Sequence, residues 1–253
     1  MGLFTSAISK TNRTEFGTDE SSPVIAAPFD STAHASEMHG AVELESALDV
    51  LWAQLLQSES PLNAADGQAY VMAHWESQEG ATTLAAALAH RAAELDPASS
   101  FCLADFDFTN SGLSFLLGLE AELGISNVLL GQSSLEESLA ITRLPNLTVL
   151  PAGYPSVGRQ VTQLYDRCQE LCELLRSRFN YVFLDVPSLG KHPNFAFWAG
   201  GRARAVLVVR AGQARRPTVA KAIQILQLMR LEVAGVALNA REFYVPKWLY
   251  TRT

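Results

Sequence analysis

Three aspartates that could take part in catalysis follow two strongly apolar runs of the sequence. Asp105 and Asp107 close the segment 101–107, and Asp185 closes the segment 181–185. Carboxylates at the ends of buried strands commonly hold Mg²⁺ and orient an attacking hydroxyl group. The ordinary alternative for each residue is helix capping or a place in a solvent-facing loop. Because three carboxylates share this position, Asp105, Asp107 and Asp185 are the candidate catalytic residues.

A third polar segment, 74–83, joins an apolar run to an alanine-rich helix. A P-loop, GxxxxGK[ST], cradles phosphate with its backbone amides, reaches the outer phosphates with its lysine and binds magnesium through its hydroxyl group. Gly80 and Thr82 stand at the second glycine and hydroxyl positions, whereas Trp75 replaces the first glycine and Ala81 replaces the lysine. Taken alone, this match indicates no more than an ordinary strand–helix turn.

The overall charge argues against a nucleic-acid partner. The 253 residues carry a formal net charge of -7, whereas binding to a duplex needs clustered Lys and Arg. The densest basic cluster consists of Arg202, Arg204, Arg210, Arg215 and Arg216. With 48% hydrophobic residues, the length suits one large α/β domain with spare sequence at an end.

The three cysteines, Cys102, Cys168 and Cys172, are too few for a disulfide framework, and their spacing predicts no metal site. This usage fits a reducing cytoplasm. No apolar run approaches the roughly 20 residues that a membrane-spanning helix needs. We therefore expect a soluble, cytoplasmic protein that reaches the inner face of the membrane only through a partner.

Strands and helices are predicted to alternate from residue 69 onward. The predicted strands are residues 69–73, 101–104, 147–150, 181–184, 205–209 and 233–238. The predicted helices are residues 81–95, 111–117, 126–130, 161–178, 217–229 and a stretch near 195–198. Because each strand is continuously apolar, the pattern predicts an α/β fold with a predominantly parallel sheet and helices on both faces. Ligands of such sheets bind beyond the carboxyl ends of the strands.

Shifts in composition divide the chain into four parts. Residues 1–40, rich in Ser, Thr, Ala, Gly and Asp, are expected to form a disordered leader. Residues 41–58 are predicted to form an amphipathic helix with leucines at 44, 48, 51, 55 and 56. Residues 68–240 form the predicted main domain, and residues 241–253 form an aromatic tail.

The order of these segments resembles the MinD/ParA-like P-loop ATPases, and most closely the bacterial tyrosine kinases (BY-kinases) of polysaccharide assembly. Residues 101–107 are similar to the Walker A′ strand ending in D-x-D, and residues 181–187 to the Walker B strand. The resemblance covers about residues 70–239 and continues through the segments 124–131, 135–139, 147–153, 208–212 and 235–239. It implies the P-loop NTPase fold.

The resemblance also implies a role for each matching residue. The carboxylates of the kinase and metal sites would be Asp105, Asp107 and Asp185. The Mg²⁺ contacts would be Thr82, Asp105 and Asp185. The nucleotide contacts would be Gly80, Thr82, Thr83 and Asn239, the last beside the adenine.

Within the loop, the chain departs from the family pattern. Ala81 removes the main positive charge that faces the outer phosphates, and Trp75 and Gln78 replace glycines that let the backbone approach them. Loss of a comparable electrostatic stabiliser typically lowers a rate by about 10²–10³. Lys191 or Arg215 could supply the missing charge, although the sequence does not place either one beside the loop.

Two further departures lie outside the loop. BY-kinases carry an E-x-x-R-x-x-R motif that links subunits into a ring, but Leu48 and Leu51 follow Glu45 at the arginine positions. The helix therefore packs on its own domain or binds another protein. BY-kinases also end in a dense tyrosine cluster, whereas the tail here has only Tyr244 and Tyr250. This aromatic tail is expected to dock rather than accept phosphate.

These departures favour a catalytically degraded BY-kinase, a pseudokinase that regulates or scaffolds bacterial exopolysaccharide biosynthesis and export. The expected partner is a membrane-embedded polysaccharide co-polymerase, and a homo-oligomer is a further option. No tightly bound cofactor is expected, with weak binding of ATP or ADP and Mg²⁺ as the alternative. Two other functions stay open: a divergent active ATPase or protein-tyrosine autokinase, and a MinD/ParA-like positioning protein.

Overall fold

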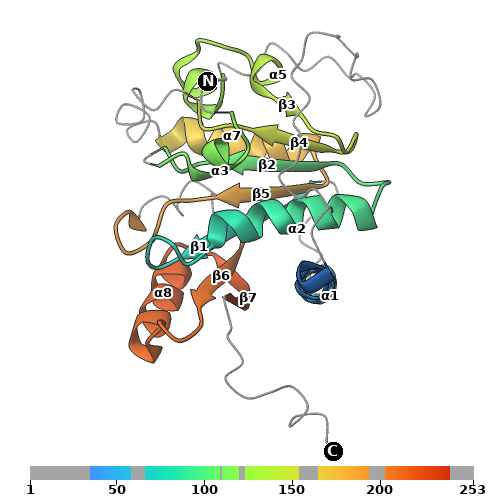
Figure 1. The fold of residues 1–253 in the computed structure, drawn as a ribbon. Coiled ribbons are helices and arrows are strands. Elements are labelled where there is room, and N and C mark those ends of the chain that lie inside the picture. The colour runs from blue at the N-terminus through green and yellow to red at the C-terminus, as the bar shows by residue number, and fades with distance from the viewer. Residues whose placement is uncertain are drawn as a thin grey trace, which may run out of the picture.

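The computed structural model describes residues 35–57, 66–108, 110–119, 123–153, 165–193 and 203–239. One sheet of seven strands runs through this part of the chain in the order β3-β4-β2-β5-β1-β6-β7 (Figure 1). The strands are β1 (Gln68–His74), β2 (Phe101–Asp105), β3 (Ala140–Ile141), β4 (Leu147–Leu150), β5 (Tyr181–Asp185), β6 (Arg204–Arg210) and β7 (Glu232–Asn239). Neighbouring strands are parallel except for the antiparallel pair of β3 and β4.

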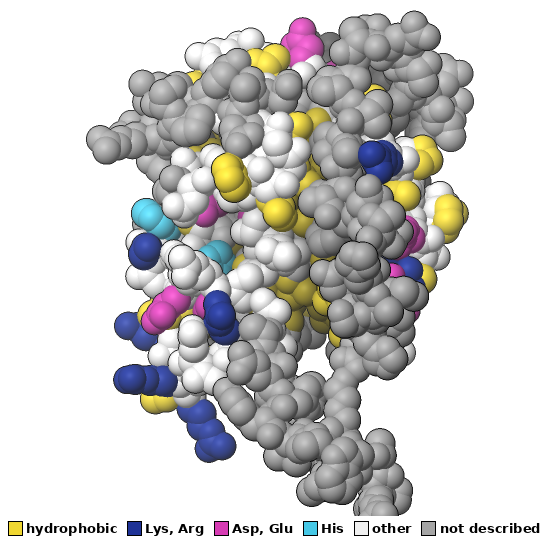
Figure 2. Space-filling model, viewed as in Figure 1, with side chains coloured by type: hydrophobic (Ala, Val, Ile, Leu, Met, Phe, Trp, Pro, Cys, Tyr) yellow, Lys and Arg dark blue, Asp and Glu magenta, His cyan; other side chains and the backbone are white. Residues whose placement is uncertain are grey.

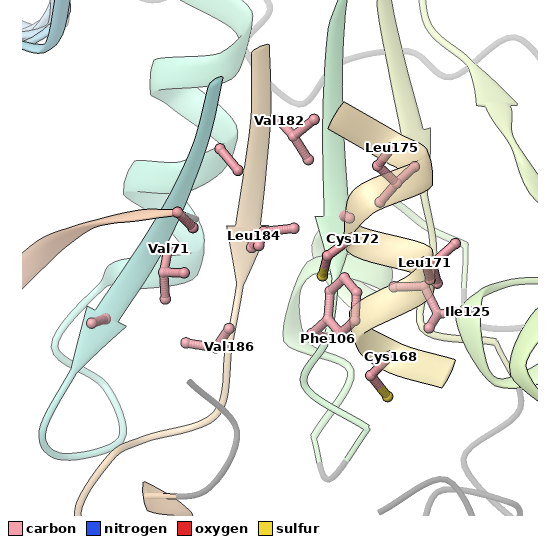
Figure 3. Packing of buried hydrophobic residues seen from close by; sticks show 14 of the residues in the cluster. Val71, Phe106, Ile125, Cys168, Leu171, Cys172, Leu175, Val182, Leu184 and Val186 are labelled. Atoms are coloured by element: carbon pink, nitrogen blue, oxygen red, sulfur yellow. The ribbon is translucent and has the colours of Figure 1, made fainter. Parts of the chain in front are cut away.

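Helices cover both faces of this sheet, which confirms the predicted α/β fold (Figure 1). They are α1 (Ala35–Gln57), α2 (Ala81–Leu95), α3 (Gly112–Leu116), α4 (Ile125–Leu130), α5 (Leu135–Ser138), α7 (Tyr165–Arg178) and α8 (Arg216–Leu228). On one face, α1 and α2 share a buried apolar cluster with the sheet. On the other face the cover comes from α4, α7 and α8, and Figure 3 shows Leu171, Cys172 and Leu175 of α7 facing the sheet. No described helix is long and apolar enough to cross a membrane.

Several elements differ from the sequence-based prediction. Helix α1 begins at Ala35, before the predicted start at residue 41, and its first residues include the good helix formers Ala, Glu and Met. The short elements α5 and β3 were not predicted. The predicted stretch near 195–198, the first residues of the predicted helix 161–178, and residues 1–34 and 240–253 lie outside the described residues.

The edge strand β7 is less buried than its apolar sequence predicts. The exposed fractions of Val236 and Leu238 are 52% and 55%. Within the described part of the chain, β7 pairs only with β6, so its side chains lack the neighbours that bury the central strands. Burial here depends on position in the sheet rather than on residue type.

Helix α1 packs on its own domain, the first of the two predicted alternatives. Trp52, which is only 3% exposed, lies edge-on against Tyr181 and Phe101 with ring centroids 4.8 Å and 5.9 Å away. The Arg91 guanidinium of α2 donates to both carboxylate oxygens of Asp49 at 2.6 Å and 3.1 Å. The aromatic contacts anchor α1 over the apolar face, and the ion pair fixes its position along α2.

Replacement of Trp52 by alanine tests this packing. We expect Trp52→Ala to lower the free energy of unfolding by about 3–5 kcal/mol, because it removes a large buried ring and leaves a cavity. Urea unfolding followed by circular dichroism measures the change. Val50→Ala, at a side chain 57% exposed on the same helix, should stay within about 0.5 kcal/mol of the parent. Equal losses in the two variants would contradict the described packing of α1.

Candidate functional site

The register of the central strands brings the candidate residues to one edge of the sheet. In the parallel pairing, Asp185 at the end of β5 lies opposite Asp105 on β2 and opposite Met72 on β1. The loop of residues 75–80 follows β1 and leads into α2. The strand-end carboxylates and the loop therefore meet at the carboxyl edge, where parallel sheets bind ligands.

Asp105 is fully buried and holds the start of α3 in place. Its Oδ2 accepts hydrogen bonds from the backbone amide and the hydroxyl group of Ser114, at 2.9 Å and 2.7 Å. Its Oδ1 accepts the amide of Asp107 at 3.0 Å. The Ser114 hydroxyl oxygen in turn accepts the amide of Ala152 at 3.0 Å. These contacts tie three segments together, so the geometry of Asp105 is that of a structural anchor.

Asp107 is also buried and shapes the turn after β2. Its two carboxylate oxygens accept the backbone amide of Asn110 at 3.1 Å and the side-chain amide of Asn110 at 3.0 Å. Its carbonyl oxygen accepts the amide of Ser111 at 2.7 Å. Two of the three candidate carboxylates are thus engaged with the protein itself.

Asp185 is the exception among the three carboxylates. It is fully buried, and neither carboxylate oxygen has a hydrogen-bond partner among the described residues. Burial raises the pKa of Asp185 well above its ordinary value, and the nearby Asp105 carboxylate raises it further, while the Thr82 side chain acts in the opposite direction. An unpaired buried carboxylate is costly. A cation at this position would satisfy it.

Burial also raises the pKa of Asp105, to about 6. The hydrogen bonds from Ser114 and from the amide of Asp107 oppose this rise, because they favour the charged form. Burial and the neighbouring acid thus raise the pKa of both carboxyl groups. Among the described residues, neither carboxylate forms an ion pair with a Lys or Arg side chain.

Backbone amides of the loop of residues 75–80 are bound by a carboxylate from the loop itself. One carboxylate oxygen of Glu79 accepts the backbone amides of Trp75 and Glu76, at 2.7 Å and 3.0 Å. In a P-loop, amides of this segment cradle a phosphate group. Here a side-chain carboxylate occupies two of them.

Gly80 and Asn239 fix the end of the loop. Gly80 has a φ of 86°, in the left-handed region that favours glycine, and a Cβ there would collide with the side-chain amide of Asn239. That amide donates to the Glu79 carbonyl oxygen at 3.0 Å. Asn239, predicted to lie beside an adenine, thus contacts the loop itself. Thr83 begins α2 with Ala81 and Thr82.

Ala81 occupies the lysine position as part of the apolar core. It is the first residue of α2, is only 2% exposed, and belongs to the cluster on the α1 and α2 face. A long cationic side chain at this position would have to leave that cluster to reach solvent. The position of the missing lysine is therefore both uncharged and packed into the apolar core.

Two cations from other elements reach the tip of the loop. The Lys191 ammonium lies 3.3 Å from the Ser77 hydroxyl, and the Arg210 guanidinium donates to the Gln78 carbonyl oxygen at 3.2 Å. Lys191 was one of the two candidates to replace the lost lysine, and the structure places it at the loop. The other candidate, Arg215, lies immediately before α8.

Trp75 fills the position of the first P-loop glycine and is held on two sides. Its carbonyl oxygen accepts the amide of Gly190 at 3.0 Å, and a Cβ on Gly190 would press against the indole ring. The Lys221 ammonium of α8 lies 5.2 Å from the centroid of that ring. Contacts of this kind are attractive because the ring face is electronegative.

Sequence reasoning missed Glu79, Ser114 and Lys221. Glu79 had a detectable signal, because an acidic residue in a loop expected to bind phosphate is a conflict of charge. Ser114 and Lys221 had none, since their contacts depend on how distant elements pack. Arg210 was noted only as part of the basic cluster, and its contact with the loop was not predicted.

The buried charge of Asp185 leads to a prediction about stability. A carboxyl group whose pKa rises on folding binds its proton more tightly in the folded state, so stability falls as pH increases above the ordinary aspartate pKa of about 3.9. We expect Asp185→Asn to raise the free energy of unfolding at pH 7, because an amide cannot ionise and the cost of the buried charge is removed. The gain should shrink on acidification towards pH 4. Urea unfolding at several pH values measures both effects.

Asp49→Asn is the matched control for this experiment. The hydrogen bond from Arg91 lowers the pKa of Asp49, so its neutralisation should give no gain at pH 7. A stability at pH 7 that is unchanged or reduced by Asp185→Asn would contradict the proposed cost of the buried charge.

Comparisons with known proteins agree with this architecture. No family model matches the sequence. The tyrosine-protein kinase CpsD of Streptococcus agalactiae is 29% identical over 140 residues, 54% of this chain and 60% of that protein. The chain thus spans about three fifths of the length of the curated relatives it matches.

Two solved structures share the fold. The kinase domain of the Escherichia coli tyrosine kinase ETK superposes with a TM-score of 0.67 at 20% identity, covering 80% of this chain and 79% of that one. MinD of Pyrococcus horikoshii, solved as a complex with Mg-ADP, superposes with a TM-score of 0.57 at 20% identity over 72% and 75% of the two chains. The chain is thus similar in sequence to a tyrosine-protein kinase, and it has the fold of a tyrosine-kinase domain and of MinD.

Proposed function

We propose that this chain is a catalytically inactive relative of the bacterial tyrosine kinases that acts by binding a partner. The observation that carries the proposal is the occupied loop, in which the Glu79 carboxylate accepts the amides of Trp75 and Glu76. A phosphate group would have to displace a like charge from these amides. It would also meet a buried alanine, Ala81, in place of a lysine.

The residues at the candidate metal position favour an active, nucleotide-binding protein more than the residues of the loop do. Asp185, with both oxygens unpaired among the described residues and Thr82 nearby, fits a hydrated Mg²⁺ ion. Bound there, Mg²⁺ would supply charge neutralisation for phosphate oxygens. Asp105 is engaged with Ser114 and is poorly placed to act as a base. Asp185 is a single candidate ligand, since the described residues contain no group of three His, Cys, Asp or Glu side chains that could hold a metal ion. The loop as it stands does not fit the phosphates.

The second candidate function is a divergent ATPase or protein-tyrosine autokinase. The unpaired carboxylate of Asp185 and the position of Lys191 at the loop favour it. Activity would require Glu79 to leave the loop amides and Lys191 to approach the phosphates. A MinD-like positioning protein would need ATP-dependent dimers, and the same alanine at position 81 weighs against it.

The partner we propose is a membrane-embedded protein of exopolysaccharide assembly, which would recruit this chain to the inner face of the membrane. The similarity to proteins named tyrosine-protein kinases, and the resemblance of the motif order to polysaccharide-assembly kinases, support this pathway. Ring assembly through α1 is disfavoured, because Leu48 is buried against the domain and carries no charge.

Nucleotide binding and turnover test the proposal directly. We expect no saturable heat on titration with ATP and Mg²⁺ up to about 1 mM, the upper end of common Michaelis constants. Incubation with ATP should give no phosphotyrosine signal. Ala81→Lys alone should leave both results unchanged, because Glu79 and Trp75 still fill the loop.

A kinase with an intact P-loop, assayed in parallel, validates the measurement, and circular dichroism establishes that each variant is folded. Micromolar ATP binding by the unmodified protein, with phosphotyrosine that disappears in Asp185→Ala, would sink the proposal and favour the autokinase.

A further inference from the structure

Five cations lie in the segments that follow β5 and β6, and we refer to them as the cationic rim. They are Lys191, Arg210, Arg215, Arg216 and Lys221. They come from the loop after β5, the end of β6, the residue before α8 and the first half of α8. Figure 2 shows Lys and Arg side chains gathered over the α8 end of the molecule. Three of the five contact loop residues 75, 77 and 78.

The charge of the rim is not neutralised within the described part of the chain. None of its members forms an ion pair there, whereas Arg91, Arg178 and Arg204 each pair with a carboxylate. All of its members except Arg210 are exposed. On a protein with a formal net charge of -7, this is a local positive field that remains available to an anion.

Folding stability gives no reason for two of these cations. Arg215 is the N-cap residue of α8 and Arg216 is its first residue, and the first turn contains no acidic side chain. The positive end of the helix dipole lies there, so each arginine is repelled by it. The presence of two arginines at a position where they destabilise the helix is better explained if they bind an anionic ligand.

We propose that the cationic rim binds a phosphotyrosine side chain on a partner polypeptide. Arginine recognises phosphate through paired hydrogen bonds, and three of the five rim residues are arginines. The partly exposed indole ring of Trp75 lies beside these charges, with the Lys221 ammonium 5.2 Å from its centroid. Phosphotyrosine combines an aromatic ring with a phosphate group. It is also the product of the enzymes whose relative this chain is.

The inference rests on the proposed function in one respect: a chain that does not transfer phosphate can use the same edge of the sheet to hold the product of a kinase. Free ATP fits this surface less well, because its phosphates would need the amides that Glu79 occupies. A phosphate on a side chain can be held from outside the loop by the rim alone.

Fluorescence anisotropy with a fluorescein-labelled Gly-Ser-pTyr-Ser-Gly peptide tests the inference. We expect the full-length protein to bind it at least about tenfold more tightly than the matching tyrosine peptide. Binding should weaken as salt is added, because exposed charges are screened. Arg215→Glu with Arg216→Glu should reduce the affinity by about tenfold or more. These changes place acidic groups at a helix start, where they are favourable, so the variant should fold normally.

Arg143→Glu with Arg230→Glu is the charge-matched control, since both residues are exposed and lie outside the rim. This control should bind the phosphopeptide like the parent. Equal affinity for the tyrosine peptide, for a glutamate peptide or for ATP would overturn the inference, as would full binding by the rim variant. The proposed function is judged separately. If the protein turned over ATP and also bound the phosphopeptide through its rim, the proposed lack of catalysis would be refuted, while the inferred phosphotyrosine site would stand.

Discussion

The position of β5 between β1 and β2 is the constraint on which the whole site depends. Parallel pairing on both sides sets the end of β5 level with the end of β2, so Asp185 lies opposite Asp105 on one side and opposite Met72 on the other. Strand β1 continues for two residues beyond Met72 before its loop begins. The same alignment buries the strand ends between helices on both faces, which makes every charge at this edge expensive unless it is paired.

The buried polar groups at this edge are satisfied to different extents in its two halves, the phosphate-binding loop and the candidate metal position. On the phosphate half, the protein supplies its own partner for the exposed amides, the Glu79 carboxylate, and closes the neighbouring position with the methyl group of Ala81. On the metal half, Asp185 stays unsatisfied among the described residues. The rim of cations lies outside both halves. It comes from segments that the sheet topology brings to the same edge.

Local signals predicted much of the fold. The bounds of α2 and β4 agree with the sequence-based ranges, because an alanine-rich period after Gly80 and a short apolar run have few other interpretations. The two-residue strand β3 is too short to have a period, and the exposure of β7 follows from its place at the sheet edge. The aspartates were predicted at strand ends, and the sheet register places Asp105 opposite Asp185. Their hydrogen-bond partners, such as Ser114, depend on how α3 packs and cannot be predicted from the local sequence.

The Glu79 carboxylate has a consequence for how the loop responds to its surroundings. A group tethered three and four residues from the amides it contacts competes with free phosphate groups as a ligand of high effective concentration, on the order of millimolar or above. Under the proposed function nucleotide does not displace it, so its position would not follow the supply of ATP. In an active P-loop the bound nucleotide sets the conformation, and that conformation changes as ATP is consumed. Here the occupant would be part of the chain, and the surface around the loop would keep one shape at high and at low concentrations of ATP.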